Sequence, residues 1–448
     1  MLSGIALVCG LLILVCLDRG HNWGGDFALY ISETQALIQG TIDELFEANK
    51  FAMDHSIRHI GPYLYPIGLP LLLIPIYLVF GMNFWVMKVF CGLFLLGALF
   101  LLYALFEKHF EHDFYIFFII SFIAFNAIFI THANAVLSDL PFFFFSLLSI
   151  LLMGSQRRTT WLHQSALGIC MVVSYLVRDV GIVLVPTLFM FQLQFVLRNG
   201  MRATDWKPLL IPYLIFALGF GLNHFLVPRG GENALTVFLA NLTPEQIIQS
   251  GKYYLKLIVS YFINGIIPGN ALWLLLSPIV LFMVLGAAVH WRQYFPYIGY
   301  IALTFAILLV WPYALRRFLF PVLPFMLFFM LKGLCFAAQR ISLKQRTLML
   351  GLGSLLLIHI AANVGEVVQY SRLDTNKILT PEMTSIYDYI DENVADGQVI
   401  GFRKPRVLRL MTGRNSVKMD ESHFDASPAE FLLIEKEACT DQINRYEK

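Results

Sequence analysis

Charged residues are scarce in this chain. Only 14% of its 448 residues are Asp, Glu, Lys or Arg, whereas soluble domains carry roughly 25%. The formal net charge is only +2, so nothing argues for a nucleic-acid partner and we expect none. Together with a mean hydropathy of +0.68, this scarcity excludes an ordinary soluble domain.

Paired cysteines and metal-ligand motifs are also lacking. Five of the six cysteines lie in apolar segments, and none forms a CxxC motif, which excludes a disulfide framework and a cysteine metal site. The run from Asp54 through His55 and Arg58 to His59 is weak evidence for a metal site. We therefore expect no cofactor, with a divalent metal ion as an unfavoured alternative. Met1–Leu17 lacks a basic start and a small-residue cleavage site, so we interpret it as a retained helix rather than a signal peptide.

Long apolar runs are what the chain has instead. Residues 84–106, 207–227, 271–289 and 347–364 are each apolar over about 18 or more positions, enough to cross a ~30 Å hydrocarbon layer. A soluble core could not bury so many such runs. The sequence therefore predicts an all-α polytopic membrane protein.

The short basic loops predict the topology. Cytoplasmic loops are enriched in Lys and Arg, and four short loops are basic: Arg157-Arg158, 198–207, Arg292 and 340–346. Placing them all in the cytoplasm gives about 11 transmembrane helices, with the N-terminus in the cytoplasm and the C-terminal segment on the extracytoplasmic (periplasmic) side. We expect the protein to lie in the plasma (inner) membrane. The expected spans are 2–18, 84–106, 114–131, 140–154, 162–177, 180–197, 207–227, 268–289, 295–311, 318–337 and 347–366.

Two outer regions interrupt this pattern. Residues 62–80 are apolar but contain four prolines, which favours a surface-lying helix in the first outer loop, 18–83, although a kinked crossing stays open. The last 80 residues alternate helix and strand signals. We predict a transmembrane catalytic domain over 1–366 and a small α/β appendage over 367–448. In that appendage we expect helices from Thr380 and from Pro405 to Met411, and strands at 398–402, 416–419 and 430–435.

Asp26 is the first candidate for catalysis. It lies in the first outer loop after Gly24 and Gly25, among apolar neighbours, and Tyr30 follows one helical turn later. A lone carboxylate of this kind suits a general base. Capping of a helix over 27–39 explains it equally well.

Asp139 and three arginines form the second candidate set. By the predicted topology, Asp139, Arg178, Arg316 and Arg317 share the outer side with Asp26. Arginine forks bind phosphate oxygens through two hydrogen bonds, so a lipid-linked phosphosugar would suit them. Helix capping by Ser138 or Asp139, and interfacial anchoring of the arginines, stay open as alternatives.

Several stretches resemble the polytopic GT-C glycosyltransferases, in particular bacterial relatives of the protein O-mannosyltransferases and of lipid A aminoarabinose transferase. The matching stretches are Gly24–Tyr30, Tyr65–Pro70 through Phe80–Asn83, Ser138–Pro141, Tyr175–Gly181 and Arg316–Pro321.

This resemblance implies an inverting glycosyltransferase that acts outside the cytoplasm. It would move a sugar from a polyprenyl-phosphate-linked donor to a lipid, glycan or protein acceptor, with membrane lipids around it. Asp26 would activate the acceptor and Asp139 would orient the site. The expected substrate-binding residues are Tyr30, Arg58, Tyr65, Arg178, Arg316 and Arg317.

Two other functions fit a polytopic membrane protein. A transporter or flippase for lipid-linked saccharides would need polar groups near the bilayer midplane and an internal repeat, and the sequence shows few of the first and none of the second. An assembly subunit without chemistry would leave Asp26 dispensable.

Overall fold

The computed structural model describes residues 1–57, 61–155, 160–200, 206–228, 242–262, 272–311, 313–419 and 428–433. The chain divides into two compact units. Met1–Arg19 and Pro66–Asp374 form the first, called here the membrane unit. Gly20–Tyr65 and Thr375–Lys448 form the second, called here the mixed unit because it contains both helices and strands.

The membrane unit consists of apolar helices. Within the described residues, six stretches are long and apolar enough to cross a membrane, and five apolar helices are shorter. The six lie in α5 (Phe84–Phe106), in η1 (Asp179–Val183) with α10 (Leu184–Asn199), and in α11 (Trp206–Leu226), α14 (Leu272–Val310), α15 (Leu323–Arg340) and α16 (Gln345–Ser371). The five are α1 (Leu2–Cys16), α4 (Gly68–Phe80), α6 (Asp113–Ala124), α8 (Asp139–Gly154) and α9 (Trp161–Val177). The predicted all-α polytopic fold is confirmed, and its orientation in the membrane stays a prediction.

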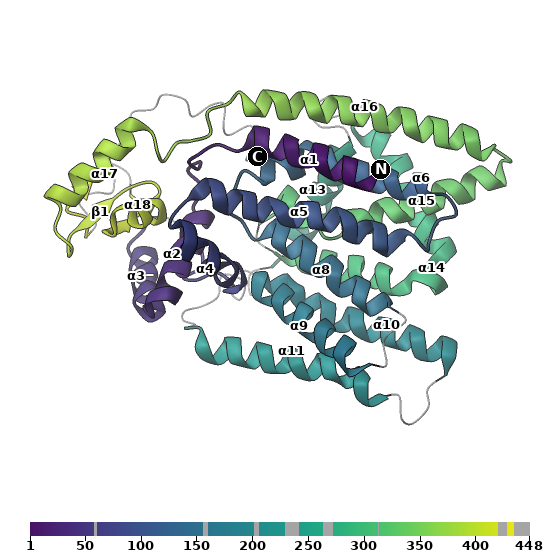
Figure 1. Cartoon of the computed structure of the whole chain (residues 1–448), viewed down its shortest axis with the longest axis horizontal. Coiled ribbons are helices and arrows are strands. Elements are labelled where there is room, and N and C mark those ends of the chain that lie inside the picture. Colours follow the sequence, from purple (N-terminus) through teal and green to yellow (C-terminus); the bar gives the residue numbers. More distant parts are fainter. Residues whose placement is uncertain are drawn as a thin grey trace. The chain divides into compact units, whose positions relative to one another are not determined.

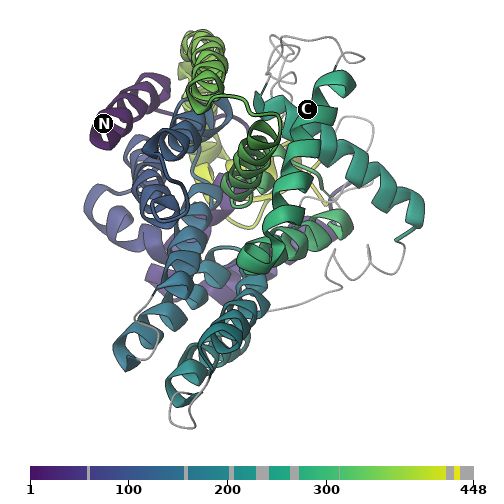
Figure 2. The ribbon, with the colours of Figure 1, turned by 90° about the vertical axis from the view of Figure 1, so that its right-hand side faces the viewer.

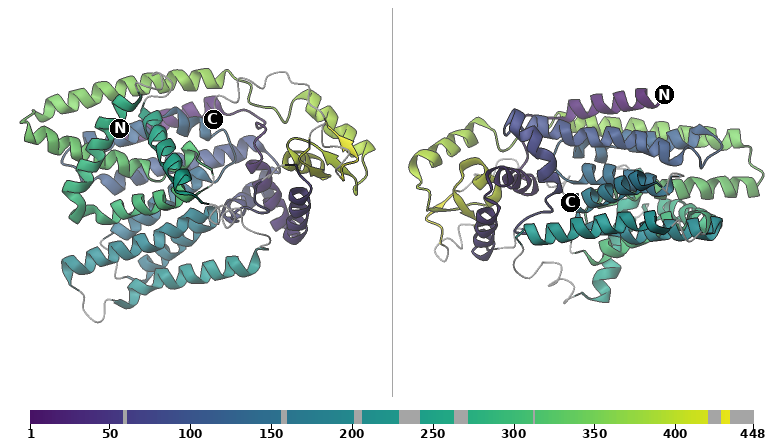
Figure 3. Two further views of the ribbon diagram at one scale, coloured as in Figure 1. Left: turned by 180° about the vertical axis from the view of Figure 1, so that it is seen from behind. Right: turned by 60° about the horizontal axis from the view of Figure 1, so that its bottom comes forward.

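Helices far apart in the sequence pack together in this unit. The first helix, α1, lies beside α5 and α16 (Figures 1 and 2), and α9 packs against α8 and α11 (Figure 3). The long helix α14 departs from helical geometry at Tyr294, with φ −127° and ψ 24°, two residues before Pro296. This irregularity separates the two spans predicted at 268–289 and 295–311, because proline disfavours helical geometry in the residues before it.

The mixed unit combines the first loop with the C-terminal segment. Its helices are α2 (Asp26–Gln39), α3 (Ile42–Asp54), α17 (Pro381–Asn393) and α18 (Pro405–Thr412), and its strands are β1 (Val399–Gly401), β2 (Asn415–Val417) and β3 (Phe431–Leu432). The strands are parallel in the order β2-β1-β3, with Ile400 opposite both Ser416 and Phe431. The predicted C-terminal helices and strands are thus present, with ends that differ by up to three residues. Positions 434 and 435 of the last predicted strand lie outside the described residues.

The first loop supplies part of the core under this sheet. Phe51 and Ile57 pack against Val399 and Val417, and the Ile57 amide donates to the carbonyl of Lys418. The sequence placed the loop with the transmembrane helices, whereas its residues 20–65 group with the C-terminal segment. The physical reason is size, since a sheet of three short strands needs apolar partners from elsewhere in the chain. The proposed domain boundary at residue 366 stays a prediction.

Two helix starts follow capping rules that the sequence displays. Thr243 and Gln246 form a reciprocal capping box at the start of α13 (Pro244–Phe262), with N···O distances of 2.9 and 3.3 Å. The Thr380 hydroxyl accepts a hydrogen bond from the Met383 amide and caps α17. Both threonines thus cap the helices that follow them.

Lys88 joins several helices of the membrane unit. Its side chain is fully buried in α5, with Nζ 2.7 Å from Asp18 Oδ1 and 2.8 Å from Asn134 Oδ1. The Asn134 amide nitrogen in turn donates to Asp18 Oδ2 and to the hydroxyl of Tyr370 on α16. The segment after α1, the helix α5, the segment after α7 (Ala127–His132) and α16 therefore meet at one buried charge.

We predict that Lys88→Met lowers the free energy of unfolding by about 3 kcal/mol, because it leaves Asp18 without its ammonium partner. Thermal unfolding in detergent micelles measures the change. Adding Asp18→Asn should recover part of the loss, and an unchanged unfolding temperature in the single variant would contradict the prediction.

Candidate functional site

Asp26 is the first residue of α2, and Gly25 occupies the N-cap position before it. The carboxylate is therefore in the first turn, where the helix dipole favours negative charge, rather than at the cap position that the sequence left open. Asp26 is partly exposed, and its Oδ1 accepts a hydrogen bond of 2.8 Å from the Tyr65 hydroxyl. It is thus both accessible and oriented.

Tyr65 is held by more than this one hydrogen bond. Its ring stacks on Tyr30, with centroids 4.7 Å apart, and its backbone N–H donates to Glu33 Oε1. Three of the predicted site residues, Asp26, Tyr30 and Tyr65, are therefore in contact within the mixed unit. Their roles in substrate binding stay predictions.

Glu33 was not singled out from the sequence. It is fully buried, and burial raises its pKa well above the ordinary value, while the Tyr65 amide and Arg406 lower it less. Its Oε2 has no hydrogen-bond partner among the described residues. The helical spacing of positions 26, 30 and 33 places them on one face and could have indicated Glu33. However, the first loop contains several other acids, and no further feature of the sequence distinguishes this one.

Arg406 is the second residue that sequence reasoning missed. It belongs to α18, which packs against α2, and it is 93% buried, with 7% of its surface exposed. Its guanidinium donates to the carbonyl of Pro62 and lies 5.8 Å from the centre of the Tyr65 ring. Arg58, which was predicted to bind substrate, lies outside the described residues.

A second cluster surrounds Asp139 in the membrane unit. Asp139 is the first residue of α8, is buried, and pairs through Oδ1 with Arg178. Its Oδ2 is 3.2 Å from His132 Nε2 and 3.6 Å from Arg317 Nε. Ser138 occupies the N-cap position of α8 and makes no side-chain capping hydrogen bond, and the Asp139 carboxylate forms ion pairs.

The two arginines of this cluster are partly exposed, although their shared carboxylate is not. About a fifth of each side chain is accessible, 22% for Arg178 and 23% for Arg317. Both guanidiniums also lie over the ring of Phe318, at 4.9 and 5.9 Å. Both guanidiniums thus combine a buried carboxylate partner with an accessible part of the side chain. The backbone carbonyl of Arg316 accepts a hydrogen bond from the Tyr261 hydroxyl.

Close backbone packing fixes the position of Arg178. A Cβ atom at Gly68, the first residue of α4, would lie 2.4 Å from the backbone of Leu176 and Val177. Only glycine permits this approach. The start of α4 therefore packs directly on the end of α9, immediately before Arg178.

The described residues contain no group of three His, Cys, Asp or Glu side chains that could hold a metal ion. Asp54 and His55 of the weak sequence motif are among them, whereas Arg58 and His59 are not. The side chains of the two clusters are carboxylates, phenols, guanidiniums and the His132 imidazole.

The fold of this chain is similar to that of several solved structures. ArnT from Cupriavidus metallidurans bound to undecaprenyl phosphate aligns with a TM-score of 0.53 at 15% identity, over 95% of this chain and 87% of ArnT. AglB, the oligosaccharyltransferase of Archaeoglobus fulgidus, in complex with an inhibitory peptide and a dolichol-phosphate, aligns at 0.51 and 11%, over 93% of this chain and 64% of AglB. The mycobacterial arabinofuranosyltransferase AftD aligns at 0.57 and 12%, over 94% of this chain and 33% of AftD.

This chain has the GT-C glycosyltransferase fold. No family model and no curated protein sequence matches it. The similarity extends over 93–95% of this chain in these three structures.

We predict that Asp139→Asn lowers the free energy of unfolding by about 3 kcal/mol, because two guanidiniums lose their shared buried counter-ion. Asp396→Asn is the matched control, since Asp396 also pairs with an arginine, Arg414, but is 92% exposed. Thermal unfolding in detergent should separate the two variants. Equal unfolding temperatures would contradict a supporting role for Asp139.

Proposed function

We propose that this protein is an inverting glycosyltransferase that uses a polyprenyl-phosphate-linked sugar donor. The GT-C fold supports this proposal, as do the lipid phosphates bound to two proteins with similar folds, undecaprenyl phosphate in ArnT and dolichol-phosphate in AglB. The acceptor belongs to the class of lipids, glycans or proteins. The basic loops of the sequence support transfer on the non-cytoplasmic face of the plasma (inner) membrane.

The single observation that carries the proposal is the accessible Asp26 carboxylate, oriented by the Tyr65 hydroxyl at 2.8 Å. In the proposed reaction, the acceptor's nucleophilic atom attacks the anomeric carbon of the sugar. The bond from that carbon to the phosphate oxygen breaks, and the electron pair leaves with the polyprenyl phosphate. Asp26 takes the acceptor's proton, as a general base does. Attack opposite the departing phosphate inverts the anomeric centre.

The cluster around Asp139 suits the donor phosphate. Arg178 and Arg317 present partly exposed guanidiniums, and such groups bind phosphate oxygens in a fixed geometry. Asp139 is buried between them, so we assign it a positioning role. Guanidiniums held in place before the reaction stabilise the charge that develops on the leaving phosphate without reorganising.

We predict that Asp26→Asn reduces sugar transfer by about 100-fold or more, because the amide cannot accept the acceptor's proton. The assay uses purified protein reconstituted in lipid vesicles with a polyprenyl-phosphate sugar. Asp54→Asn is the control, because Asp54 is an exposed acid of the same loop and should retain activity. Full transfer by the Asp26 variant would refute the assignment.

We further predict that Arg317→Gln raises the donor KM by about tenfold or more, because a charge-assisted hydrogen bond to phosphate is lost. A donor titration at fixed acceptor concentration measures this effect. Arg340→Gln, at the last residue of α15, controls for the loss of one positive charge. A donor KM that does not change in the Arg317 variant would exclude contact with the donor phosphate.

A further inference from the structure

The contacts of Arg406 are concentrated on one short stretch of the first loop. Its guanidinium donates to the Pro62 carbonyl and lies over the Tyr65 ring. A Cβ atom added at Gly61 would be 3.0 Å from Nη1 of the arginine. Gly61 also has φ +107°, a conformation that L side chains rarely adopt. The guanidinium therefore packs closely against residues 61–65.

The stretch that Arg406 contacts ends at the residue that orients Asp26. The Tyr65 phenol donates to Asp26, and the Tyr65 amide donates to Glu33. A displacement of residues 61–65 would therefore alter both hydrogen bonds at once. Arg406 of the C-terminal segment contacts this stretch directly, at the Pro62 carbonyl, at Gly61 and at the Tyr65 ring.

The position of Arg406 is itself well defined. It lies in the first turn of α18, whose Leu408 is packed in an apolar cluster with Met383 and Tyr387 of α17. Trp23, from the first loop, packs against the same cluster. The helix that carries the arginine therefore packs into a cluster to which both the C-terminal segment and the first loop contribute.

Arg406 acts electrostatically on Glu33, a buried acid of α2. Glu33 is the acid whose pKa it lowers, but burial outweighs that effect and keeps the Glu33 pKa well above the ordinary value. The Arg406 Nε atom has no hydrogen-bond partner among the described residues. Burying a guanidinium in this way costs free energy, so packing alone does not favour an arginine at this position.

We propose that Arg406, from the C-terminal segment, is a positioning residue for the candidate base Asp26 and acts through residues 61–65. This inference rests on the proposed function. It gives the C-terminal segment a part in the reaction rather than in folding alone. A misplacement of about 1 Å at a reacting group can cost on the order of 100-fold in rate, so even a small shift of Tyr65 would be measurable.

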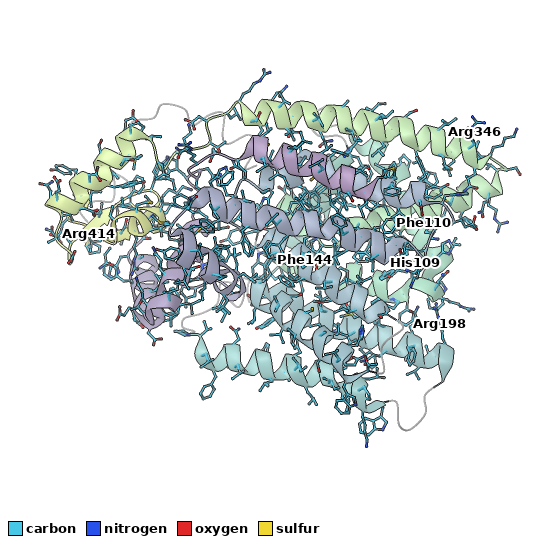
Figure 4. All side chains as sticks on the ribbon, in the orientation of Figure 1. His109, Phe110, Phe144, Arg198, Arg346 and Arg414 are labelled. Carbon is cyan, nitrogen blue, oxygen red and sulfur yellow. The ribbon has the colours of Figure 1, made fainter. Side chains whose placement is uncertain are left out.

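Arg414 provides a matched control within the same segment (Figure 4). It pairs with Asp396 and donates to the Val394 carbonyl, so its contacts stay within the C-terminal residues. Removing either guanidinium deletes one positive charge from the mixed unit. Only the Arg406 change removes a contact with residues 61–65.

The test measures kcat and KM for full-length Arg406→Met, Arg406→Lys, Arg414→Met and Asp26→Asn in the vesicle assay. We expect Arg406→Met to lower kcat by about tenfold or more with little change in donor KM. Arg406→Lys should recover part of this loss, since it keeps the charge and a donor. Arg414→Met should behave as the unchanged protein.

Three outcomes would overturn the inference. These are an unchanged kcat in Arg406→Met, an equal loss in Arg414→Met, or a loss confined to the donor KM. If Arg406→Met does not fold, Gly61→Ala serves instead, because it pushes on the same guanidinium from the loop side, and an unchanged kcat there would equally refute the inference. Normal transfer by Asp26→Asn would instead refute the proposed function, so the two failures are distinguishable.

Discussion

The structure depends on the exclusion of water and charge from a hydrocarbon layer. Backbone groups in such a layer must be satisfied within the chain, which favours helices, and ionisable side chains are costly there. The charged clusters described here accordingly lie at helix ends. Asp139 begins α8, Arg178 follows α9, and Arg317 lies in the short helix η2 (Arg316–Leu319). The three charged residues of this cluster therefore lie in or next to the first or last turn of a helix.

Two buried carboxyl groups show how their surroundings decide what such a group can do. Asp139 lies among Arg178, Arg317 and His132, so it serves as a counter-ion. Glu33 accepts a hydrogen bond from the Tyr65 amide, and burial raises its pKa well above the ordinary value. The partly exposed Asp26 differs from both. It is accessible and accepts a hydrogen bond from the Tyr65 hydroxyl, which is why we assign it the role of base.

Much of the fold could be predicted from the sequence because its signals are local. Apolar runs, capping residues such as Thr243 and Thr380, and the short strands near the C-terminus depend on neighbouring residues. The spacing of Asp26 and Tyr30 was equally readable. Tyr65 came from a family resemblance, and its contact with Asp26 required the structure. Lys88 was hidden by the apolar run around it, and its partner Asp18 lies 70 residues away.

Glu33 and Arg406 could not be predicted for a different reason. Each acquires its significance from a partner on another element, and one sequence carries no record of which elements meet. The same cause explains why the first loop was assigned to the transmembrane domain. Its apolar residues Phe51 and Ile57 are completed by strands near the other end of the chain.

The bond between Arg406 and Pro62 joins residues 344 positions apart. Chains grow at roughly 5–20 residues per second, so Arg406 is synthesised roughly 17–70 s after Pro62. During that interval the loop has already been made, while α18 has not. In a nascent chain, Asp26 and residues 61–65 therefore exist before Arg406 can contact them. The completed arrangement forms only when the last part of the protein has been synthesised. The order of synthesis therefore sets the earliest time at which the candidate site can be complete.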